Sequence, residues 1–321
     1  MTKFYKISQK SVVSTTDPAE STIKLLISPT SDEIRFAMDT YDIDEHSLVS
    51  AIDPDEVSRL EIESEHFAVI WKSPRRFTSD GTLKFEVSSM GLFVFKNELI
   101  ILLPDDVSLF DAKYFQKVDS IRDVMLRLLS SSIFHFLGHL RVIDSLSNEI
   151  KSKVNSSMEN KYLLQMFDLS ESLVYYLNAI SSNNAVLEKL RMNSRKLNLT
   201  SEELELLEDV TIDATQCYKQ AEIYSSILTG LMDARGNVVN NNVNTLLKRL
   251  TIINTIFLPL NLLASIGGMS EYSTWTSGIS WQMAYAFFMV GMVVIGLLTF
   301  VAINPSTLKI KKTRAAAKRR M

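Results

Sequence analysis

The fold of this chain is decided by residues 244–271, NTLLKRLTIINTIFLPLNLLASIGGMSE. Within this stretch the segment 250–266 carries no charged side chain and is about long enough to cross a bilayer as a helix. A second uncharged apolar segment, 283–303, follows after a short polar connection. Either segment alone could be the buried core helix of a soluble protein, but two in tandem favour the membrane. The sequence therefore predicts a hairpin of two transmembrane helices.

Basic residues lie on one side of this hairpin. Lys248 and Arg249 precede the first span. The second span is followed by Lys309, Lys311, Lys312, Arg314, Lys318, Arg319 and Arg320, with no acid among them. Because basic flanks stay in the cytoplasm, both chain ends are expected there, with Trp275 and Trp281 at the outer interface. The N-terminal residues show no signal-peptide or transit-peptide pattern, so a multi-pass protein of the plasma (inner) membrane is expected.

Residues 22–104 have a different pattern. Short runs rich in Val, Ile, Leu and Phe predict strands at 22–28, 59–64, 66–71, 83–89, 91–95 and 99–103. Segments that begin with capping and acidic residues predict helices at 31–41 and 53–60. A hairpin turning at Lys96 and Asn97 would make the sheet at least partly antiparallel. This part of the chain is therefore expected to form an α/β domain.

Residues beyond Pro104 favour long helices, because no further proline occurs before Pro259. Apolar residues recur at spacings of three and four in 121–150 and 162–180, which predicts two antiparallel amphipathic helices. A third helix is expected to begin after Thr200, with no clear end before Ile266. At about 1.5 Å per residue this helix would be about 100 Å long, so it needs neighbours in a bundle or an oligomer.

The expected fold class is thus an α/β cytoplasmic domain, followed by a long helical hairpin and a stalk helix that continues into a two-helix transmembrane hairpin. The expected domains are the α/β domain (1–115), long helices and stalk (116–249), first transmembrane helix (250–266), outer loop (267–282), second transmembrane helix (283–303) and basic cytoplasmic tail (304–321).

A polar stripe runs along the first span. Spacings of three and four place seven residues on one helix face, namely Asn244, Leu247, Thr251, Asn254, Leu258, Asn261 and Ser265. Polar groups in hydrocarbon are costly unless they find partners or water, so this face should line a bundle interior or a pore. Interhelical hydrogen bonding without conduction is the alternative. Two helices cannot enclose a water-filled path, so a pore requires several copies around an axis.

The stripe has the chemistry of a cation path. Its amide and hydroxyl oxygens are hard ligands that suit a cation or its water shell. Leu247 and Leu258, with Leu250 at the edge, would form rings able to close a pore by dewetting. Pro259 would free a carbonyl one turn earlier, which is tolerated where it faces protein or water.

Residues 244–270 resemble the first transmembrane segment of the CorA-type metal ion transporters (the MIT family), roughly N-x-x-M-K-x-L-T-x-x-x-x-x-F-x-P-L-x-x-x-x-x-x-Y-G-M-N. The order of domains is similar over essentially the whole chain. The resemblance implies a homopentamer in a lipid bilayer that conducts divalent cations. It also implies an inner polar ring at Asn244, a hydrophobic gate at Leu250 and Leu258, and a pore-facing position at Asn261.

The resemblance further implies an ion entrance at Gly268, Met269 and Ser270, where the family signature is G-M-N. This chain is a divergent member, with GMS in place of GMN and Gly267 in place of the signature tyrosine. We expect Glu271 to compensate through an anionic ring at the mouth, a solvated loop charge being the alternative. The two glycines are expected to allow a tight turn with carbonyls directed at the axis.

Other candidate sites are weaker. Asp209 resembles an acidic position that binds a regulatory metal between subunits in magnesium-regulated members. His135 and His139 stand four apart but have no third ligand nearby in sequence, so ordinary helix-face histidines are favoured. Acidic clusters occur at Asp39, Asp42, Asp44 and Glu45 and at Asp53, Asp55 and Glu56; these could sense divalent cations, although a solvated surface is the commoner meaning.

Several function classes are disfavoured. No phosphate loop, dinucleotide fingerprint or nucleophile elbow is present, so an enzyme or an ATP-driven pump is not expected, and no cofactor is expected. The single Cys217 excludes an intramolecular disulfide. Nucleic-acid binding is disfavoured because anionic lipid explains the basic residues beside the spans. The leading hypothesis is a channel or transporter for Mg²⁺ or Zn²⁺, with Co²⁺ and Ni²⁺ also open. The alternative is a non-conducting membrane-anchored stalk protein of structural or signalling function.

Overall fold

The structure, a computed structural model, describes residues 1–75, 83–110, 114–156 and 160–303. The expected basic tail, 304–321, lies outside the described residues, as does part of the expected connection between the two amphipathic helices. Contacts divide the chain into two units, Met1–Asp233 and Ala234–Met321.

The first unit contains a seven-stranded sheet with the order β2-β1-β3-β7-β6-β5-β4. The strands are β1 (Thr2–Ser8), β2 (Ser11–Thr15), β3 (Ile23–Ile27), β4 (Arg59–Ile62), β5 (His66–Pro74), β6 (Val87–Phe95) and β7 (Leu99–Leu103). Only β3 and β7 pair in parallel, and all other neighbours are antiparallel. The expected hairpin at Lys96 and Asn97 joins β6 to β7.

The helices are α1 (Ser31–Tyr41), α2 (Glu45–Ser50), α3 (Ile121–Ser156), α4 (Asn160–Met192), α5 (Ser201–Gly267), α6 (Ser270–Trp275) and α7 (Trp281–Ile303), with a short 3-10 turn at Pro18–Glu20. The start of α5 is the expected one. The Thr200 hydroxyl accepts from the Glu203 amide at 3.2 Å, and the Glu203 carboxylate accepts from the Thr200 amide at 2.8 Å. The 67-residue α5 belongs to both units.

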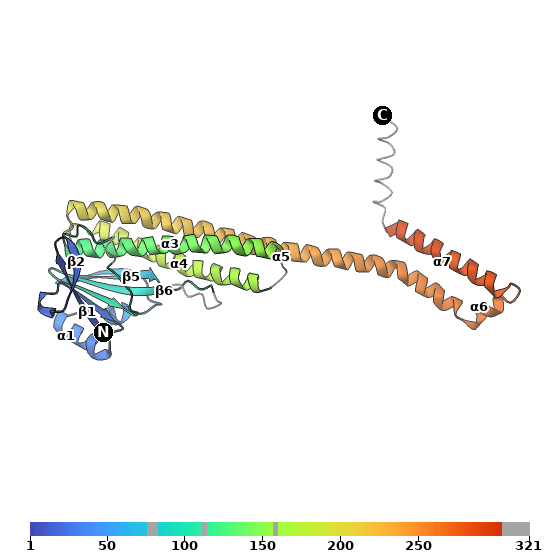
Figure 1. Ribbon diagram of the computed structural model, residues 1–321, viewed down its shortest axis with the longest axis horizontal. Coiled ribbons are helices and arrows are strands. Elements are labelled where there is room, and N and C mark those ends of the chain that lie inside the picture. The colour runs from blue at the N-terminus through green and yellow to red at the C-terminus, as the bar shows by residue number, and fades with distance from the viewer. Residues whose placement is uncertain (76–82, 111–113, 157–159, 304–321) are drawn as a thin grey trace, which may run out of the picture. The chain divides into compact units, whose positions relative to one another are not determined.

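Helices cover both faces of the sheet, because successive strand residues point to opposite faces. Ala68 and Phe93 pack with α1 and α2 on one face. On the other face Val69 and Leu92 belong to a larger core that includes α3, α4 and the first part of α5. Figure 1 shows these three long helices side by side along the sheet. The expected α/β domain and long helices are therefore confirmed.

A buried polar network joins the sheet to α4. The Asn183 side chain, which is fully buried, accepts from the Lys72 amide at 3.0 Å and donates to the Lys72 carbonyl at 2.8 Å. It also accepts from the Ser58 hydroxyl at 2.7 Å. One side chain thus takes up strand groups that would otherwise face a helix without partners.

The expected helix at 53–60 was wrong. Residues 53–58 form turns, and β4 begins at Arg59. The Asp53 carboxylate accepts from the Asp55 amide at 2.9 Å, and the Lys72 ammonium donates to the carbonyls of Asp53 and Pro54 at 3.3 and 2.6 Å. The Asp53 carbonyl also accepts from the Glu56 amide at 3.4 Å, so the chain makes a single turn here and no continuing helix. Burial lowers the pKa of Lys72, while the charges of nearby acids oppose that shift.

The expected strands at 83–89 and 91–95 are one strand, β6, which begins at Val87. Gly91, the first residue of the second expected strand, lies inside β6. A Cβ at Gly91 would stand 2.4 Å from the Cβ of Ala51, the residue after α2. The glycine therefore allows close packing of the chain against the strand.

The hairpin of β1 and β2 was missed. Its turn residues, Gln9 and Lys10, both have positive φ angles, 48° and 58°. Glycine, asparagine or aspartate normally marks such a turn, and none of them is present here. Helix α4 also ends later than expected, at Met192.

We predict that Asn183→Ala destabilises the protein by roughly 2–4 kcal/mol, because it leaves the amide and carbonyl of Lys72 buried without their partner. The measurement is the unfolding midpoint of the purified protein in detergent. Asn178→Ala is the matched control, since Asn178 is an exposed amide on the same helix and its loss should change stability by less than about 0.5 kcal/mol. Equal shifts for both variants would contradict this role of Asn183.

Candidate functional site in the hairpin of α5 and α7

Three contacts define the packing of α7 against α5 and α6. A Cβ at Gly296 would lie 3.6 Å from Cδ1 of Leu260, and a Cβ at Gly267 would lie 2.7 Å from Cζ of Phe288. The Tyr272 hydroxyl of α6 reaches the Ala284 carbonyl at 3.4 Å. As residue numbers increase along α5, the numbers of the contacting residues on α7 decrease. The two apolar helices form an antiparallel hairpin in one register.

The hairpin covers one face of each helix. On α5 the partly covered positions of the apolar part are Ile252, Ile256, Pro259, Leu260, Leu263 and Gly267. On α7 the covered or partly covered positions are Ala284, Phe288, Gly291, Met292, Ile295, Gly296 and Thr299. Small residues recur on the α7 face, which lets two helices approach closely where no hydrophobic effect drives them together. Among the described residues, α5 and α7 each contain a segment long and apolar enough to cross a membrane.

The polar stripe lies on nearly the opposite side of α5 from α7. All seven stripe residues and Leu250 at its edge are exposed; the seven are Asn244, Leu247, Thr251, Asn254, Leu258, Asn261 and Ser265. At about 100° per residue their mean direction differs from that of the covered face by about 160°. The helix continues through Pro259, so the stripe is unbroken. The structure therefore brings these residues onto one uncovered face.

One hydroxyl on this face has a defined hydrogen bond. Thr251 donates its hydroxyl proton to the Leu247 carbonyl at 2.8 Å. Because that proton is engaged, the oxygen can only accept toward the helix exterior. Together with the amide oxygens of Asn254 and Asn261, it gives the face oxygen acceptors without charge, which suit a hard cation or its bound water.

The predicted entrance residues follow the end of α5. The Gly268 amide donates to the carbonyls of Ala264 and Ser265 at 3.1 and 3.2 Å. Ser270 begins α6 and donates its hydroxyl to the Glu271 carboxylate at 3.3 Å. Both of these side chains and Met269 are exposed. The entrance residues thus form one short polar segment.

The chain turns at 268–269 as expected, but not through a backbone angle that only glycine adopts. Neither Gly267 nor Gly268 has a positive φ angle, and a Cβ at Gly268 would make only ordinary contacts, at 3.6 Å. Gly267 is required for space, because the Phe288 ring occupies the position of its missing side chain.

Asp209, the predicted regulatory position, is an exposed residue of α5 one turn before Asp213. Burial, and secondly the charge of Asp209, raises the pKa of Asp213. In the part of the chain that the structure describes, no three His, Cys, Asp or Glu residues are placed to hold a metal ion. Among the described residues, Asp209 therefore has no group of neighbouring side chains that could bind a metal ion with it.

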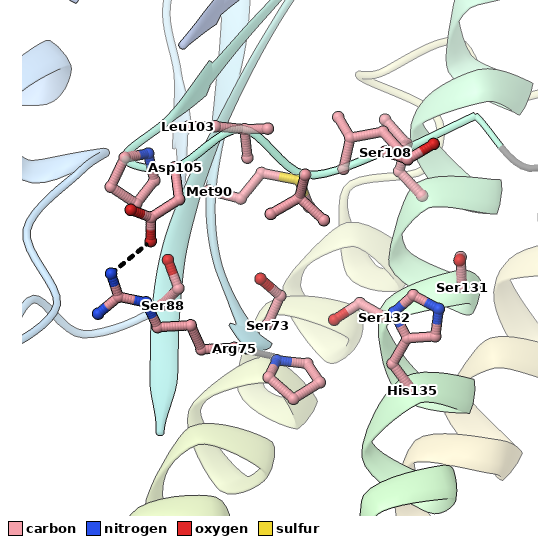
Figure 2. A pocket seen from close by; sticks show the side chains of 15 residues that line it. Ser73, Arg75, Ser88, Met90, Leu103, Asp105, Ser108, Ser131, Ser132 and His135 are labelled. Atoms are coloured by element: carbon pink, nitrogen blue, oxygen red, sulfur yellow. Dashed lines mark ion pairs between the residues drawn. The ribbon is translucent and has the colours of Figure 1, made fainter. Parts of the chain in front are cut away.

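The histidine pair does not form a shared ligand set. His139 lies 2.7 Å from the Tyr176 hydroxyl through Nδ1, and burial lowers its pKa. His135 is exposed and lines a cavity of about 60 Å³ between α3 and the sheet, with serines and the Arg75–Asp105 ion pair (Figure 2). At roughly 30 Å³ per water, this cavity has the size of about two waters.

The first acidic cluster lines an open hollow of about 660 Å³ together with three glutamates of β4 and the turn after it. One of them, Glu61, accepts from Arg59 and from the Ser47 hydroxyl. In the second cluster, Asp53 forms the turn described above. Neither cluster holds a metal-binding group of three within the described ranges.

Sequence reasoning missed Tyr272 and Phe288. Their rings lie with centroids 5.7 Å apart at an angle of 60°, next to the predicted entrance. The available signal was the unusual glycine at position 267, since a missing large side chain requires something else to fill its space.

The α/β domain, the long helix and the apolar hairpin with its uncovered polar face define a membrane protein of the two-span transporter class. The chain belongs to the CorA-like Mg²⁺ transporter family. The model of this family, described as "CorA-like Mg2+ transporter protein", matches residues 25–309. This confirms the resemblance seen in residues 244–270. It is a family of membrane transporters for divalent cations.

Known proteins agree with this assignment. The chain is 24% identical over 233 residues to a "Cobalt/magnesium transport protein CorA" of Methanocaldococcus jannaschii, covering 70% of this chain and 71% of that protein. A protein of the same description from Thermotoga maritima is 27% identical over 179 residues, which cover 56% of this chain and 50% of that protein.

Solved structures share the fold. The complete CorA magnesium transporter of Methanocaldococcus jannaschii superposes with a TM-score of 0.75 at 20% identity, covering 93% of this chain and 96% of that one. The full-length CmaX protein gives 0.72 at 12% identity, covering 94% and 97%. The ZntB cytoplasmic domain of Vibrio parahaemolyticus gives 0.59 at 11% identity, covering 74% and 98%.

We predict that Gly296→Leu destabilises the hairpin by about 1–3 kcal/mol, because its side chain must enter the space of Leu260. Gly291→Leu is the control, since a Cβ at Gly291 meets nothing within 4 Å. Thermal unfolding of both variants in detergent tests the register. A larger effect at Gly291 than at Gly296 would show that the two helices pack differently.

Proposed function

We propose that several copies of this chain, five by the family resemblance, assemble around an axis with the polar stripe of α5 turned inward, and that divalent cations cross the membrane along it. One observation carries the proposal: the stripe is exposed on the side of α5 opposite to α7. In a bilayer such a face needs water or polar partners. Around a common axis the stripes of several copies would enclose water, which a single hairpin cannot do.

The order of residues along the stripe assigns a gate and ion-binding positions to the proposed path. From the cytoplasmic end it would run from the Asn244 ring past leucines to Thr251 and Asn254. Leu258 then separates these from Asn261 and Ser265. Leucine rings can close a narrow path by dewetting, whereas the amide rings can hold a hydrated ion. The leucines would therefore act as the gate, and the amides as resting positions.

Self-association has a second support in the first unit. Ile212, Ile223 and Ile227 lie on one face of α5 and are exposed to 65%, 56% and 49%. Buried positions of the same helix, such as Ala214 and Cys217, face the core of the chain. The exposed isoleucines present apolar area that a neighbouring subunit would cover. Asp209 lies on this exposed part of α5, so a regulatory metal would need a ligand from that neighbour.

The cargo we propose is Mg²⁺. The stripe and the entrance offer amide, hydroxyl and carboxylate oxygens, which suit hard cations that keep part of their water. None of the predicted path residues is Cys or His, the ligands that Zn²⁺ prefers. Two relatives carry the description cobalt/magnesium transport protein, which also supports this choice. Zinc, cobalt and nickel ions are the competing cargoes for the test.

We place the protein in the plasma (inner) membrane with both termini in the cytoplasm. The positive flanks Lys248 and Arg249 support this orientation. The entrance segment Gly268–Glu271 would then face outward, and no ATP site needs to be invoked because cations would follow their gradient.

We predict that Asn254→Leu and Asn261→Leu each lower Mg²⁺ flux into liposomes by about 10–100-fold, equivalent to about 1.4–2.7 kcal/mol in the barrier. Each change replaces a ring of hard oxygen ligands by a ring of hydrocarbon. Thr255→Val is the control, because Thr255 is a polar residue of the same span outside the stripe. Separate dyes report magnesium and zinc. Zinc flux without magnesium flux would overturn the cargo, and no flux from the wild type would favour the non-conducting stalk protein.

We predict that Glu271→Gln raises the half-saturating Mg²⁺ concentration several-fold at low salt and changes the maximal flux little. The reason is that a ring of carboxylates concentrates divalent cations at the mouth. Because the Debye length falls from about 10 Å at 0.1 M to about 3 Å at 1 M salt, the difference from wild type should shrink as salt is added. A difference that is independent of salt would mean that Glu271 binds the ion directly.

A further inference from the structure

The segment Gly268–Glu271 is held at both ends by one aromatic ring of α7. At its first end, Gly267 lies under Phe288, with a Cβ position 2.7 Å from Cζ and 2.9 Å from Cε2 of that ring. At its second end, the Tyr272 ring meets the same Phe288 ring edge to face, at a centroid distance of 5.7 Å. Only four residues separate the two contacts.

The second end has further attachments. The Tyr272 hydroxyl reaches the buried Ala284 carbonyl at 3.4 Å, one turn before Phe288 on α7. The Tyr272 carbonyl accepts from the Thr276 amide at 3.0 Å and from the Thr276 hydroxyl at 2.8 Å. Tyr272 is therefore fixed through its ring and its backbone, whereas the neighbouring Ser270 and Glu271 are exposed.

We propose that Gly267, Tyr272 and Phe288 form an aromatic brace that positions Ser270 and Glu271, so that ion affinity and selectivity at the mouth depend on residues that do not contact the ion. The proposal rests on the proposed function, because it assigns a role at the entrance of that pathway. Tyr272 and Phe288 are positioning residues.

Steric exclusion supports this inference. A side chain at position 267 and the ring of Phe288 cannot occupy the same space, since even a Cβ approaches the ring to 2.7 Å. The tyrosine of the family signature could therefore stand at position 267 only if the Phe288 ring moved away. In this chain the aromatic group next to the mouth comes from α7, and the mouth is tied directly to the second span.

The geometry also explains why a short segment needs such a brace. An exposed turn that leads into a helix of only six residues would sample many arrangements without further contacts, and fixing each residue costs about 1–2 kcal/mol of conformational free energy. Because the Phe288 ring contacts both ends, part of this conformational entropy is already lost when the protein folds. Less entropy is then lost when an ion binds. Ordered ligands then distinguish cations by size and hydration better than mobile ones.

The test compares Phe288→Ala with Phe287→Ala in liposomes. Phe287 is the adjacent phenylalanine and is 72% exposed, outside the brace. Phe288→Ala should raise the half-saturating Mg²⁺ concentration about threefold or more, and lower the preference for Mg²⁺ over Zn²⁺, with a smaller change in maximal flux. Phe287→Ala should behave as wild type. Equal behaviour of the two variants in affinity and selectivity would overturn the proposal.

Exchanging the large and small side chains at positions 267 and 288 tests whether the lost affinity can be restored. Gly267→Tyr alone should impair affinity, because its ring meets Phe288. The double variant Gly267→Tyr with Phe288→Gly should recover most of the wild-type affinity, since the total aromatic volume is restored in the same place. Failure of the double variant to improve on Gly267→Tyr would contradict the exchange. Tyr272→Leu tests the other contact if Phe288→Ala does not fold, and unchanged affinity and selectivity in that variant would also overturn the brace.

A spin label tests the brace without ion flux. The label is attached to Ser270→Cys, and its mobility should rise with Phe288→Ala and stay unchanged with Phe287→Ala. Cys217 does not interfere, because it is fully buried and burial raises its pKa to about 12. If the wild type conducts no ion but the label still responds to Phe288→Ala, the proposed function fails and the brace stands. An unresponsive label means that Phe288 does not hold the segment.

Discussion

The constraint on which the rest of this structure depends is that a polar group in the membrane must find a partner or water. Helix α5 carries amides and hydroxyls on one face of an apolar segment, and α7 packs against nearly the opposite face. The hairpin leaves that face uncovered in a single copy, although the Thr251 hydroxyl donates to the Leu247 carbonyl. The proposed assembly, the proposed water-filled path and the proposed lipid-facing role of the remaining α7 surface all rest on this one arrangement.

The first unit meets the same requirement by a different route. There the polar groups of β5 that face the helices are taken up by the side chain of Asn183 on α4. The Lys72 ammonium is held by loop carbonyls and by the Ser89 hydroxyl. Such a satisfied network positions the helices on the sheet as well as stabilising them. Helix α5 packs on the helices positioned in this way, through its buried small residues Ala214 and Ala221.

The proposed mouth combines two departures from the family signature that the sequence resembles. The departure from G-M-N leaves a shorter hydroxyl at Ser270 and a carboxylate beside it, while the departure at Gly267 makes room for Phe288. These changes lie within five residues of one another, and they are linked physically, because the same ring contacts both ends of the changed segment. In the proposed brace, one ring of α7 links the residues at both ends of this segment.

Much of this protein was determined by the sequence alone. The two spans, the long α5 with its Thr200 cap, the alternation that makes the sheet and the composition of the stripe follow from local periodicity and capping, which need no tertiary information. Tertiary structure decided the rest. The turn at 53–58 depends on a distant lysine, and Gly91 and Gly267 owe their identity to Ala51 and Phe288, which approach them from other elements. Contacts between segments far apart in the chain leave no periodic signal, so only the packed structure shows which face of α5 stays uncovered and that Phe288 contacts Gly267 and Tyr272.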